Sequence, residues 1–350
     1  MGGPRDTACL VGQEPTEQRL LRSLQSGRLP HAWLMTGKPG IGKATLAYRM
    51  ARFLLARPDG YSGFGGDLSI DPEDSVFRQV AARAHPDLLV LERGVNERSG
   101  KPRSEIVVEE VRKIGERLRH TAFGSGWRLL IVDSADEMNR SAANALLKLL
   151  EEPPPQALLL LISHAPGRLL PTIRSRCCSL PLAPLPDRLV IALMAEQLPD
   201  LTDEERRRLA VLAEGSIGKA VALYEAGGLQ LYRRILAVLN RAGQGMGVTE
   251  AHRLAEELGG AKAGDSFKTA FALLNWWLAR VISAGARGQL PPPVVEEEAG
   301  LARRLLARRA LADWVGLWEK LSALAECCER MNLDRKQALL SALIDLDVTA

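Results

Sequence analysis

The chain has few cysteines, and their positions exclude two common uses of this residue. Its 350 residues contain five of them: Cys9, Cys177, Cys178, Cys327 and Cys328. Two adjacent pairs and a singleton match neither the spacing of metal ligands nor a disulfide framework. We therefore expect reduced thiols in a cytoplasmic protein, because disulfides are rare in that compartment.

The sequence also lacks a segment that could cross a membrane or direct secretion. Its longest apolar run, Ala157–Ile162, is far shorter than the roughly 20 residues that a membrane-spanning helix needs. The first nine residues carry Arg5 and Asp6 and have no apolar core, so we do not expect a signal peptide. These absences predict a cytoplasmic protein with no membrane partner.

Neither sign of charge dominates. The chain carries 46 Lys and Arg side chains against 42 Asp and Glu, a formal net charge of +4. So mild a balance neither requires nor excludes a nucleic-acid partner. Hydrophobic residues make up 46%, as in a globular protein, and the length predicts two or three domains.

Short apolar runs alternate with helical stretches in the first half, which predicts an α/β domain with a parallel sheet. Four strands are expected, over Ala32–Thr36, Asp87–Leu91, Leu129–Val132 and Ala157–Ser163. A glycine-rich turn and a helix over Lys43–Leu55 follow the first strand. The Gly- and Asp-rich stretch Pro58–Asp74 is expected to be a surface insertion.

Three prolines between Pro181 and Pro186 mark the end of this domain, because proline breaks regular structure. Beyond them the apolar periodicity is helical throughout. Helices are expected over Leu189–Glu196, Asp203–Ala213, Lys219–Glu225, Leu229–Ala242, Thr249–Leu258, Phe267–Ser283, Leu301–Met331 (continuous or broken) and Asp334–Asp345. The expected domains are residues 1–183, a small helical domain at 184–242 and a larger one at 243–350.

The glycine-rich turn predicts a phosphate-binding loop. Gly37, Gly40 and Gly42 precede Lys43, between a predicted strand and a predicted helix. Glycines let the backbone N–H groups and the helix N-terminus face phosphate oxygens, and the lysine adds a positive charge. The pattern then requires Ser or Thr as a magnesium ligand, but this chain has Ala44.

Two further features weaken the expected nucleotide site. Thr45 could replace the missing hydroxyl only from a position rotated by about 100° on the helix. Asp133, after the third strand, is placed to hold a metal shell, or merely to cap the next turn. An active ATPase normally has a glutamate next to it as the base, and Ser134 stands there instead. We expect weak binding of ATP or ADP and impaired hydrolysis.

Three motifs resemble the clamp-loader branch of AAA+ proteins over residues 10–185. Residues 144–154 read Asn-Ala-Leu-Leu-Lys-Leu-Leu-Glu-Glu-Pro-Pro, residues 28–34 are similar to the strand that enters the family's phosphate loop, and residues 175–177 match its Ser-Arg-Cys motif. The resemblance implies an AAA+ P-loop domain at 1–183, followed by a helical lid and a helical collar for oligomerisation.

The departures from the family pattern indicate which kind of subunit this is. Ala44 and Ser134 remove the metal ligand and the base, and Gly218 occupies the place of a sensor arginine in the active subunits. The resemblance therefore implies an ATPase-deficient delta prime type of subunit; an active gamma/tau-like ATPase is the alternative. Residues 44–132 lack the family's four zinc-binding cysteines, so we expect no zinc.

The resemblance also implies a role and partners. Arg176 would be an arginine finger that reaches the nucleotide of a neighbouring subunit; a plain surface arginine is the alternative, and Arg174 is a weaker candidate. Ser163 lies where the family has its first sensor, or it caps a turn, and His31 is expected to be packed. Implied partners are gamma/tau and delta subunits, with the sliding clamp and primer-template DNA reached through the complex. Several basic residues could face that DNA or form a solvated surface: Arg112, Lys113, Arg117, Arg119 and Arg128.

Overall fold

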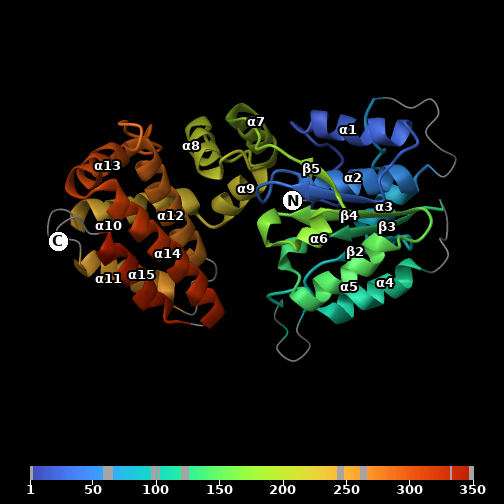
Figure 1. The fold of residues 1–350 in the computed structure, drawn as a ribbon. Coiled ribbons are helices and arrows are strands. Elements are labelled where there is room, and N and C mark those ends of the chain that lie inside the picture. Colours follow the sequence, from blue (N-terminus) through green and yellow to red (C-terminus); the bar gives the residue numbers. More distant parts are fainter. Residues whose placement is uncertain are drawn as a thin grey trace. The chain divides into compact units, whose positions relative to one another are not determined.

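The computed structural model describes residues 3–57, 66–95, 100, 103–119, 126–242, 248–260, 266–331 and 333–346. The chain divides into two compact units (Figure 1). The first comprises residues 1–193 with 215–218, and the second comprises residues 194–214 with 219–350. The three-domain division at 183 and 242 stays a prediction.

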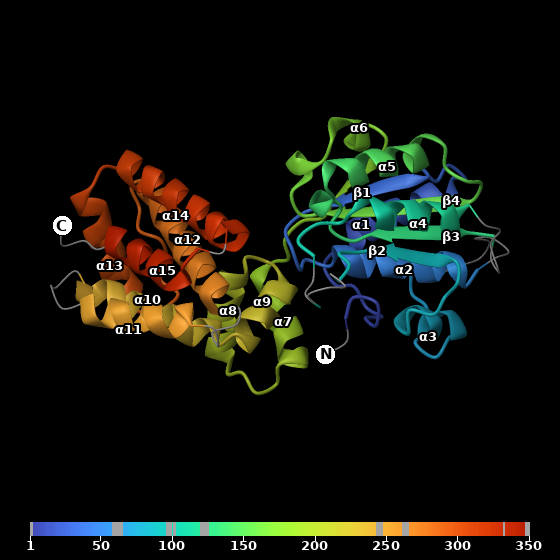
Figure 2. The ribbon, with the colours of Figure 1, turned by 90° about the horizontal axis from the view of Figure 1, so that it is seen from below.

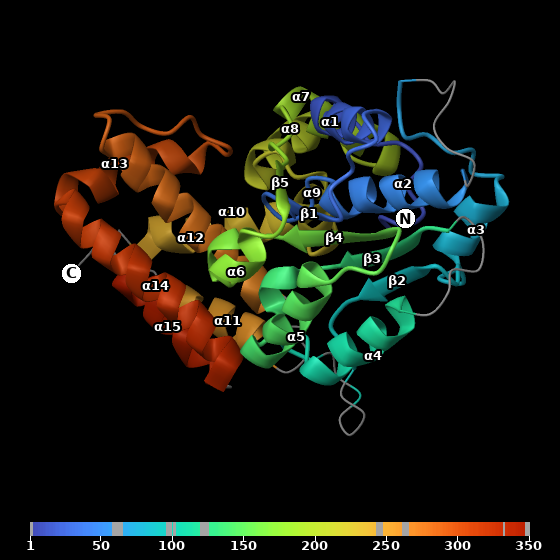
Figure 3. The same cartoon turned by 45° about the vertical axis from the view of Figure 1, so that its right-hand side comes forward.

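A parallel five-stranded sheet forms the centre of the first unit (Figure 3). Its strands are β1 (Ala32–Thr36), β2 (Leu88–Leu91), β3 (Arg128–Val132), β4 (Ala157–Ser163) and β5 (Cys178–Pro181), in the order β2-β3-β4-β1-β5. The predicted α/β class and its four strands are confirmed. β5 was not predicted from the sequence; it ends in Pro181 and, among the described strands, pairs with β1 alone. An edge strand tolerates proline because one of its sides needs no ladder hydrogen bonds.

Helices cover both faces of this sheet (Figure 2). They are α1 (Glu14–Gln25), α2 (Lys43–Leu55), α3 (Ser75–Ala81), α4 (Val108–Leu118), α5 (Arg140–Glu151) and α6 (Pro171–Arg174), with 3₁₀ turns η1 (Ala135–Glu137) and η2 (Pro166–Arg168). Alternate strand residues point to opposite sides. Trp33 and Met35 pack with α1 and α2, whereas Leu34 packs with α4 and α5. The three central strands β1, β3 and β4 bury both faces in this way, so they are almost wholly apolar.

The second unit is helical. It contains α8 (Asp203–Ala213), α10 (Gly228–Ala242), α11 (Val248–Gly259), α12 (Ser266–Gly285), α13 (Glu297–Arg308), α14 (Leu311–Met331) and α15 (Arg335–Asp345), while α7 (Asp187–Gln197) and α9 (Ile217–Glu225) each run from one unit into the other. The expected helix Leu301–Met331 is broken after Arg308. Trp277 is buried in the core, and Trp276 lies edge-on to Tyr232. No helix in the described parts of the chain is both long enough and apolar enough to span a bilayer.

Candidate functional site

The predicted phosphate loop lies between β1 and α2, at the carboxyl end of the sheet. Gly37, Gly40 and Gly42 have φ angles of 143°, 72° and 104°, a region that residues with a side chain rarely adopt. A Cβ atom on Gly37 would also lie 2.7 Å from the carbonyl oxygen of Leu182. Glycine is therefore required at these positions by backbone conformation, and the strand, loop and helix have the predicted bounds.

Lys43 is turned onto its own loop. Its Nζ donates hydrogen bonds to the carbonyl oxygens of Gly37 and Lys38, each at 2.6 Å. Burial lowers the pKa of Lys43 from 10.5 to about 8, although the charges of Asp136 and Asp133 act in the opposite direction. The ammonium group that should meet a phosphate is thus engaged by the loop.

The turn before α9 closes the same loop from another direction. The hydroxyl of Ser216 donates to the carbonyl oxygen of Pro39 at 2.7 Å. The backbone N–H of Gly218 donates to the carbonyl oxygen of Gly40 at 3.0 Å. A Cβ atom on Gly218 would lie 2.8 Å from Cα of Gly40. Because the two backbones touch, position 218 has no space for the sensor arginine that the family resemblance would place there.

Gln13 completes this set of contacts. Its Nε2 donates to the carbonyl oxygen of Ile41 at 3.3 Å and to that of Ala183 at 2.7 Å. The carbonyl groups of residues 37–41 therefore each accept a hydrogen bond from a side chain or backbone group of the chain itself. Fully paired groups of this kind hold a loop in one conformation.

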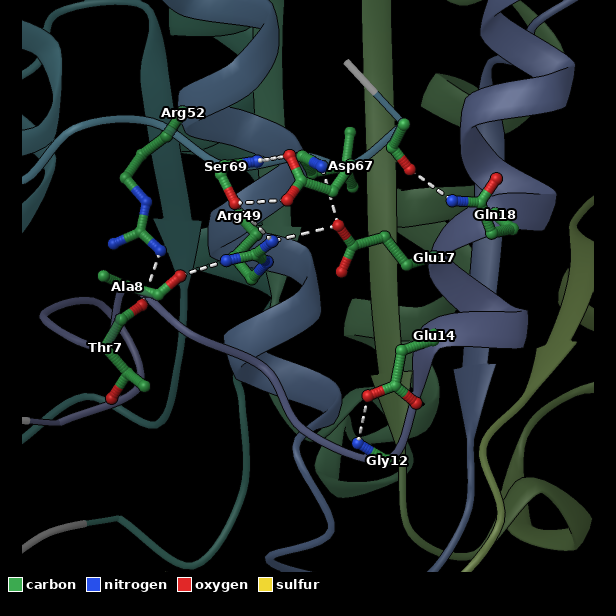
Figure 4. Close-up of polar contacts among 12 residues, drawn as sticks. Thr7, Ala8, Gly12, Glu14, Glu17, Gln18, Arg49, Arg52, Asp67 and Ser69 are labelled. Carbon is green, nitrogen blue, oxygen red and sulfur yellow. Dashed lines mark hydrogen bonds and ion pairs between the residues drawn. The ribbon is translucent and has the colours of Figure 1, made fainter.

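Two buried arginines of α2 fasten the N-terminal segment beside this loop (Figure 4). Arg52 donates to the carbonyl oxygens of Arg5 and Thr7 at 2.8 and 2.7 Å. Arg49 donates a hydrogen bond to the carbonyl oxygen of Ala8. We call residues 3–12, which these contacts hold, the N-terminal strap.

The strap reaches the phosphate loop. A Cβ atom on Gly42 would lie 2.8 Å from Cδ1 of Leu10, so the strap packs against the start of α2. Burial, together with the charge of Arg49, lowers the pKa of Arg52 to about 10, so Arg52 stays charged at neutral pH. Charged donors form stronger hydrogen bonds than neutral ones, which favours a firmly held strap.

Glu17 of α1 balances the charge of Arg49 in this interior (Figure 4). Its Oε1 lies 2.9 Å from Nη2 of Arg49 and also accepts the backbone N–H of Leu68 at 2.6 Å. Leu68 is buried in the core, so the prediction of a surface insertion is wrong for this residue. Residues 58–65 of that predicted insertion lie outside the described part of the chain.

The acidic side of the site follows β3. Burial raises the pKa of Asp133, against the effect of His164 and Lys43. Ser134 has φ 62°, and its Oγ lies 3.2 Å from Nε2 of His164. Ser134 therefore has a basic side chain within hydrogen-bond distance. Burial lowers the pKa of His164, so its ring is neutral at pH 7 and can accept a proton.

Asp136 joins the turn after β3 to the end of β4. Its two carboxylate oxygens accept the backbone N–H groups of His164 at 2.9 Å and Ala165 at 3.2 Å. Burial acts to raise the pKa of Asp136, but it is outweighed by opposing effects, of which the hydrogen bond from the His164 backbone is the largest, so the pKa lies below its usual value. Ser163, at the end of β4, is fully buried beside this junction. Its sensor role and that of Thr45 as a substitute ligand stay predictions.

The residues present do not fit a magnesium ion in the usual way. Ala44 presents a methyl group, which packs against the apolar core. Within the ranges that the structure describes, no group of three or more His, Cys, Asp or Glu side chains could hold a metal ion. Asp133 would be left to bind magnesium without the hydroxyl that normally accompanies it.

Arg176 follows α6, and its guanidinium faces α5 and α6. Its Nη2 lies 2.8 Å from Oε1 of Glu151, and its Nη1 donates to the carbonyl oxygen of Thr172 at 3.1 Å. The side chain is 38% exposed. Burial raises the pKa of the neighbouring Cys177 to about 12, so its thiol stays protonated. His31 lies 3.0 Å from the carbonyl oxygen of Leu150, which agrees with the expected packed role.

The basic residues that were predicted to face DNA or solvent lie on different surfaces of the first unit. Arg112, Arg119 and Lys148 line a groove of about 530 Å³ between α4 and α5. Lys113 and Arg117 instead line a pocket of about 470 Å³ beside β2, together with three glutamates. Arg128 is turned inward, with its guanidinium bonded to the carbonyl oxygens of Leu118 and Pro155.

Sequence reasoning missed several residues that shape the site: Gln13, Asp136, Glu151, His164 and Ser216. Two signals were available, because His164 directly follows the candidate sensor Ser163 and Glu151 belongs to the Glu-Glu-Pro-Pro motif. Gln13 and Ser216 gave no local signal. Their loop partners lie 28 and 177 residues away.

Comparisons with known proteins agree with this architecture. A family model described as DNA polymerase III, delta subunit, matches residues 12–186, half of the chain. The DNA polymerase III subunit delta' of Pseudomonas aeruginosa is 39% identical over 213 residues, which cover 60% of this chain and 61% of that protein. Subunit delta' of Escherichia coli is 34% identical over 214 residues, which cover 60% of this chain and 59% of that protein. Subunit gamma/tau of Mycobacterium bovis is 32% identical over 221 residues, which cover 61% of this chain and 35% of that protein.

The match therefore spans 61% and 59% of the length of these two delta' relatives, and the family model lies within the first unit. The motifs, the parallel sheet and the altered phosphate loop all lie within that unit. On this evidence the chain belongs to the delta prime subunits of DNA polymerase III, in the clamp-loader family of AAA+ proteins.

Proposed function

We propose that this protein is an ATPase-deficient clamp-loader subunit that completes the ATP site of a neighbouring gamma/tau subunit. It acts with gamma/tau and delta subunits in the cytoplasm, and through that complex it takes part in placing a sliding clamp on primer-template DNA. Its helical C-terminal half serves as the collar that holds the ring of subunits together. Its own pocket binds ATP or ADP weakly and binds no zinc.

One observation carries the proposed deficiency: the phosphate loop is closed by the chain's own groups. The carbonyls of residues 37–41 are paired, and Lys43 donates to two of them. Lys43 must leave its two carbonyl partners before it can reach the phosphates of a nucleotide, in a loop whose other carbonyl groups are held in place by Gln13, Ser216 and Gly218. Ala44 then offers magnesium no ligand, so productive binding is disfavoured twice.

The proposed role of Arg176 rests on its chemistry and on its exposure. A guanidinium keeps its charge at all physiological pH values and makes paired contacts with phosphate oxygens. Such a group, supplied from a neighbouring subunit, stabilises the charge that develops during phosphoryl transfer and accelerates it by about 10³ to 10⁵. The described partners of Arg176 are in α5 and α6, away from the loop at Gly37–Lys43.

The groove between α4 and α5 supports a DNA contact within the complex. Arg112, Arg119 and Lys148 place positive charge along it, and Ser141 and Asn144 add polar groups that can bond to phosphate oxygens. Replacing one of these basic residues should weaken DNA binding irrespective of sequence and reduce its dependence on salt.

The test is reconstitution with gamma/tau, delta, the sliding clamp and primer-template DNA. Arg176→Ala should lower hydrolysis at the neighbouring ATP site by about 10³-fold or more while leaving the complex intact by gel filtration. Arg174→Ala, at the exposed end of α6, is the matched control and should leave turnover unchanged. Equal turnover in both variants and the wild type would refute the proposed finger.

His164 favours a second candidate function, a slow gamma/tau-like ATPase in which Thr45 supplies the metal ligand. A neutral imidazole 3.2 Å from the Ser134 hydroxyl provides a proton acceptor close to the place of the missing glutamate. Under that hypothesis the isolated chain hydrolyses Mg-ATP, and both His164→Ala and Lys43→Ala abolish the activity. We expect no turnover by the isolated chain.

A further inference from the structure

The contact between Arg176 and Glu151 suggests how the proposed finger is controlled. Glu151 is the last residue of α5, where the helix dipole is negative and a carboxylate is unfavourable. A cation beside it relieves this repulsion. The guanidinium of Arg176 supplies that cation at 2.8 Å and is held on its other side by the carbonyl oxygen of Thr172.

These two contacts use the nitrogens that a phosphate would need. Nη1 donates to Thr172 and Nη2 to Glu151, and these are the nitrogens that bind a phosphate end-on as a fork. The guanidinium cannot hold the carboxylate and present this fork to a phosphate at the same time. The two bound states of Arg176 are therefore mutually exclusive.

We infer that Glu151 is a positioning residue that holds Arg176 in reserve until a neighbouring subunit presents its nucleotide. On this scheme, which rests on the proposed arginine finger, the γ-phosphate of the neighbour replaces the Glu151 carboxylate as the partner of the guanidinium. The arginine is kept folded back while the neighbouring site is empty, and it becomes available when the stronger anion arrives.

The exposure of the pair makes this exchange feasible. Arg176 is 38% and Glu151 48% exposed, so water and salt screen their attraction. An ion pair as accessible as this one shifts the equilibrium between the paired and the released arginine by a factor of about 1.5 to 5. A phosphate with two or more negative charges can overcome such a contact, whereas a deeply buried ion pair would hold the finger permanently.

The test compares Glu151→Gln with Glu152→Gln in the reconstituted complex. Glutamine keeps the shape of residue 151 and removes its charge, while Glu152 is an exposed carboxylate one residue further along. At low salt, Glu151→Gln should lower the KM for ATP at the finger-dependent site by about 1.5- to 5-fold, with kcat unchanged. The difference should shrink as salt is added, and Glu152→Gln should behave as the wild type.

A second measurement does not depend on turnover. Phenylglyoxal modification of Arg176 in the isolated chain, followed by mass spectrometry of its peptide, should be faster in Glu151→Gln than in the wild type or Glu152→Gln. Glu151→Asp, whose shorter side chain reaches less well, should show an intermediate rate. Unchanged modification in all three variants would overturn the inference.

The outcomes separate this inference from the proposed function. If Arg176→Ala leaves turnover intact, the finger is refuted and the reserve mechanism falls with it. If Arg176→Ala abolishes turnover but Glu151→Gln lowers kcat or leaves KM unchanged, the finger stands and the reserve mechanism is wrong. Lower KM, unchanged kcat and faster modification together support both.

Discussion

Replacing Glu17 with glutamine should cost the first unit much of its stability. Glu17 and Arg49 form an ion pair at 2.9 Å, with side chains 6% and 5% exposed. Glutamine keeps an oxygen that can accept the Leu68 N–H, but it removes the buried carboxylate that balances the charge of Arg49, which leaves only the weaker attraction of the more exposed Asp67. An unpaired charge in the interior costs several times more than the loss of a surface pair.

The expected magnitude follows from measured losses at other buried pairs. Breaking one partner of a buried pair typically costs about 3–5 kcal/mol. Since the substituted glutamine retains one acceptor, we expect the lower end, about 3 kcal/mol in the free energy of unfolding. For a unit of this size each kcal/mol shifts the midpoint by about 2–4 °C, so the first unit should melt about 6–12 °C lower.

Calorimetry and urea unfolding of the whole chain measure this change. Glu14→Gln is the matched control: Glu14 lies in the first turn of the same helix, is exposed and accepts only the nearby N–H of Gly12 in the described contacts. It should cost less than about 1 kcal/mol. Glu17→Met combined with Arg49→Met should recover part of the loss, because both charges of the pair are then gone, while the Leu68 N–H and the Ala8 carbonyl each lose a partner.

Two results would refute this reasoning. One is a Glu17→Gln variant whose free energy of unfolding lies within about 1 kcal/mol of the wild type, a loss no larger than that of an ordinary hydrogen bond. The other is a double methionine variant that is no more stable than the single variant. Either would mean that water or a rearrangement neutralises Arg49, and that the strap does not depend on this ion pair.

Three further predictions concern the phosphate loop and its surroundings. Because burial lowers the pKa of Lys43 from 10.5 to about 8, the unfolded chain binds more protons between these values; Lys43 should therefore add stability as pH rises from 8 to 10.5, and urea unfolding of Lys43→Met should lack this gain. Gly218→Ala should destabilise the chain by about 1–3 kcal/mol through overlap with the loop backbone, whereas Gly167→Ala, with open space around it, should be nearly neutral in thermal unfolding. Cys177, whose pKa is raised to about 12, should react with a thiol reagent at pH 8 far more slowly than the exposed Cys9; equal rates would contradict its burial.

The strongest local signals in the sequence predicted the centre of the fold well. The first strand and the following helix have the expected bounds, Ala32–Thr36 and Lys43–Leu55. A buried apolar run, a glycine turn and an amphipathic helix are all written in neighbouring residues. β5 was missed because Cys178–Pro181 is short, only partly buried and next to prolines. Its strand conformation is set by pairing with β1, which lies far away in sequence.

The chemistry of the site was predicted by residue type, and its closure was not. Ala44 and Ser134 could be recognised as departures because the motif states which residues belong there. The contacts that close the loop come from Gln13 and Ser216, on distant parts of the chain. His164 meets Ser134 only because the strands that precede them, β4 and β3, are neighbours in the sheet. Such meetings depend on topology, which no single segment of sequence reveals.

The backbone contact at Gly218 would make the proposed loss of ATPase activity hard to reverse. Restoring a hydroxyl at residue 44 or a carboxylate at residue 134 changes only the pocket lining. Any side chain at residue 218 must first separate two backbones, because its Cβ would lie 2.8 Å from Cα of Gly40. An arginine placed at residue 218 could therefore reach a nucleotide only after the loop had rearranged.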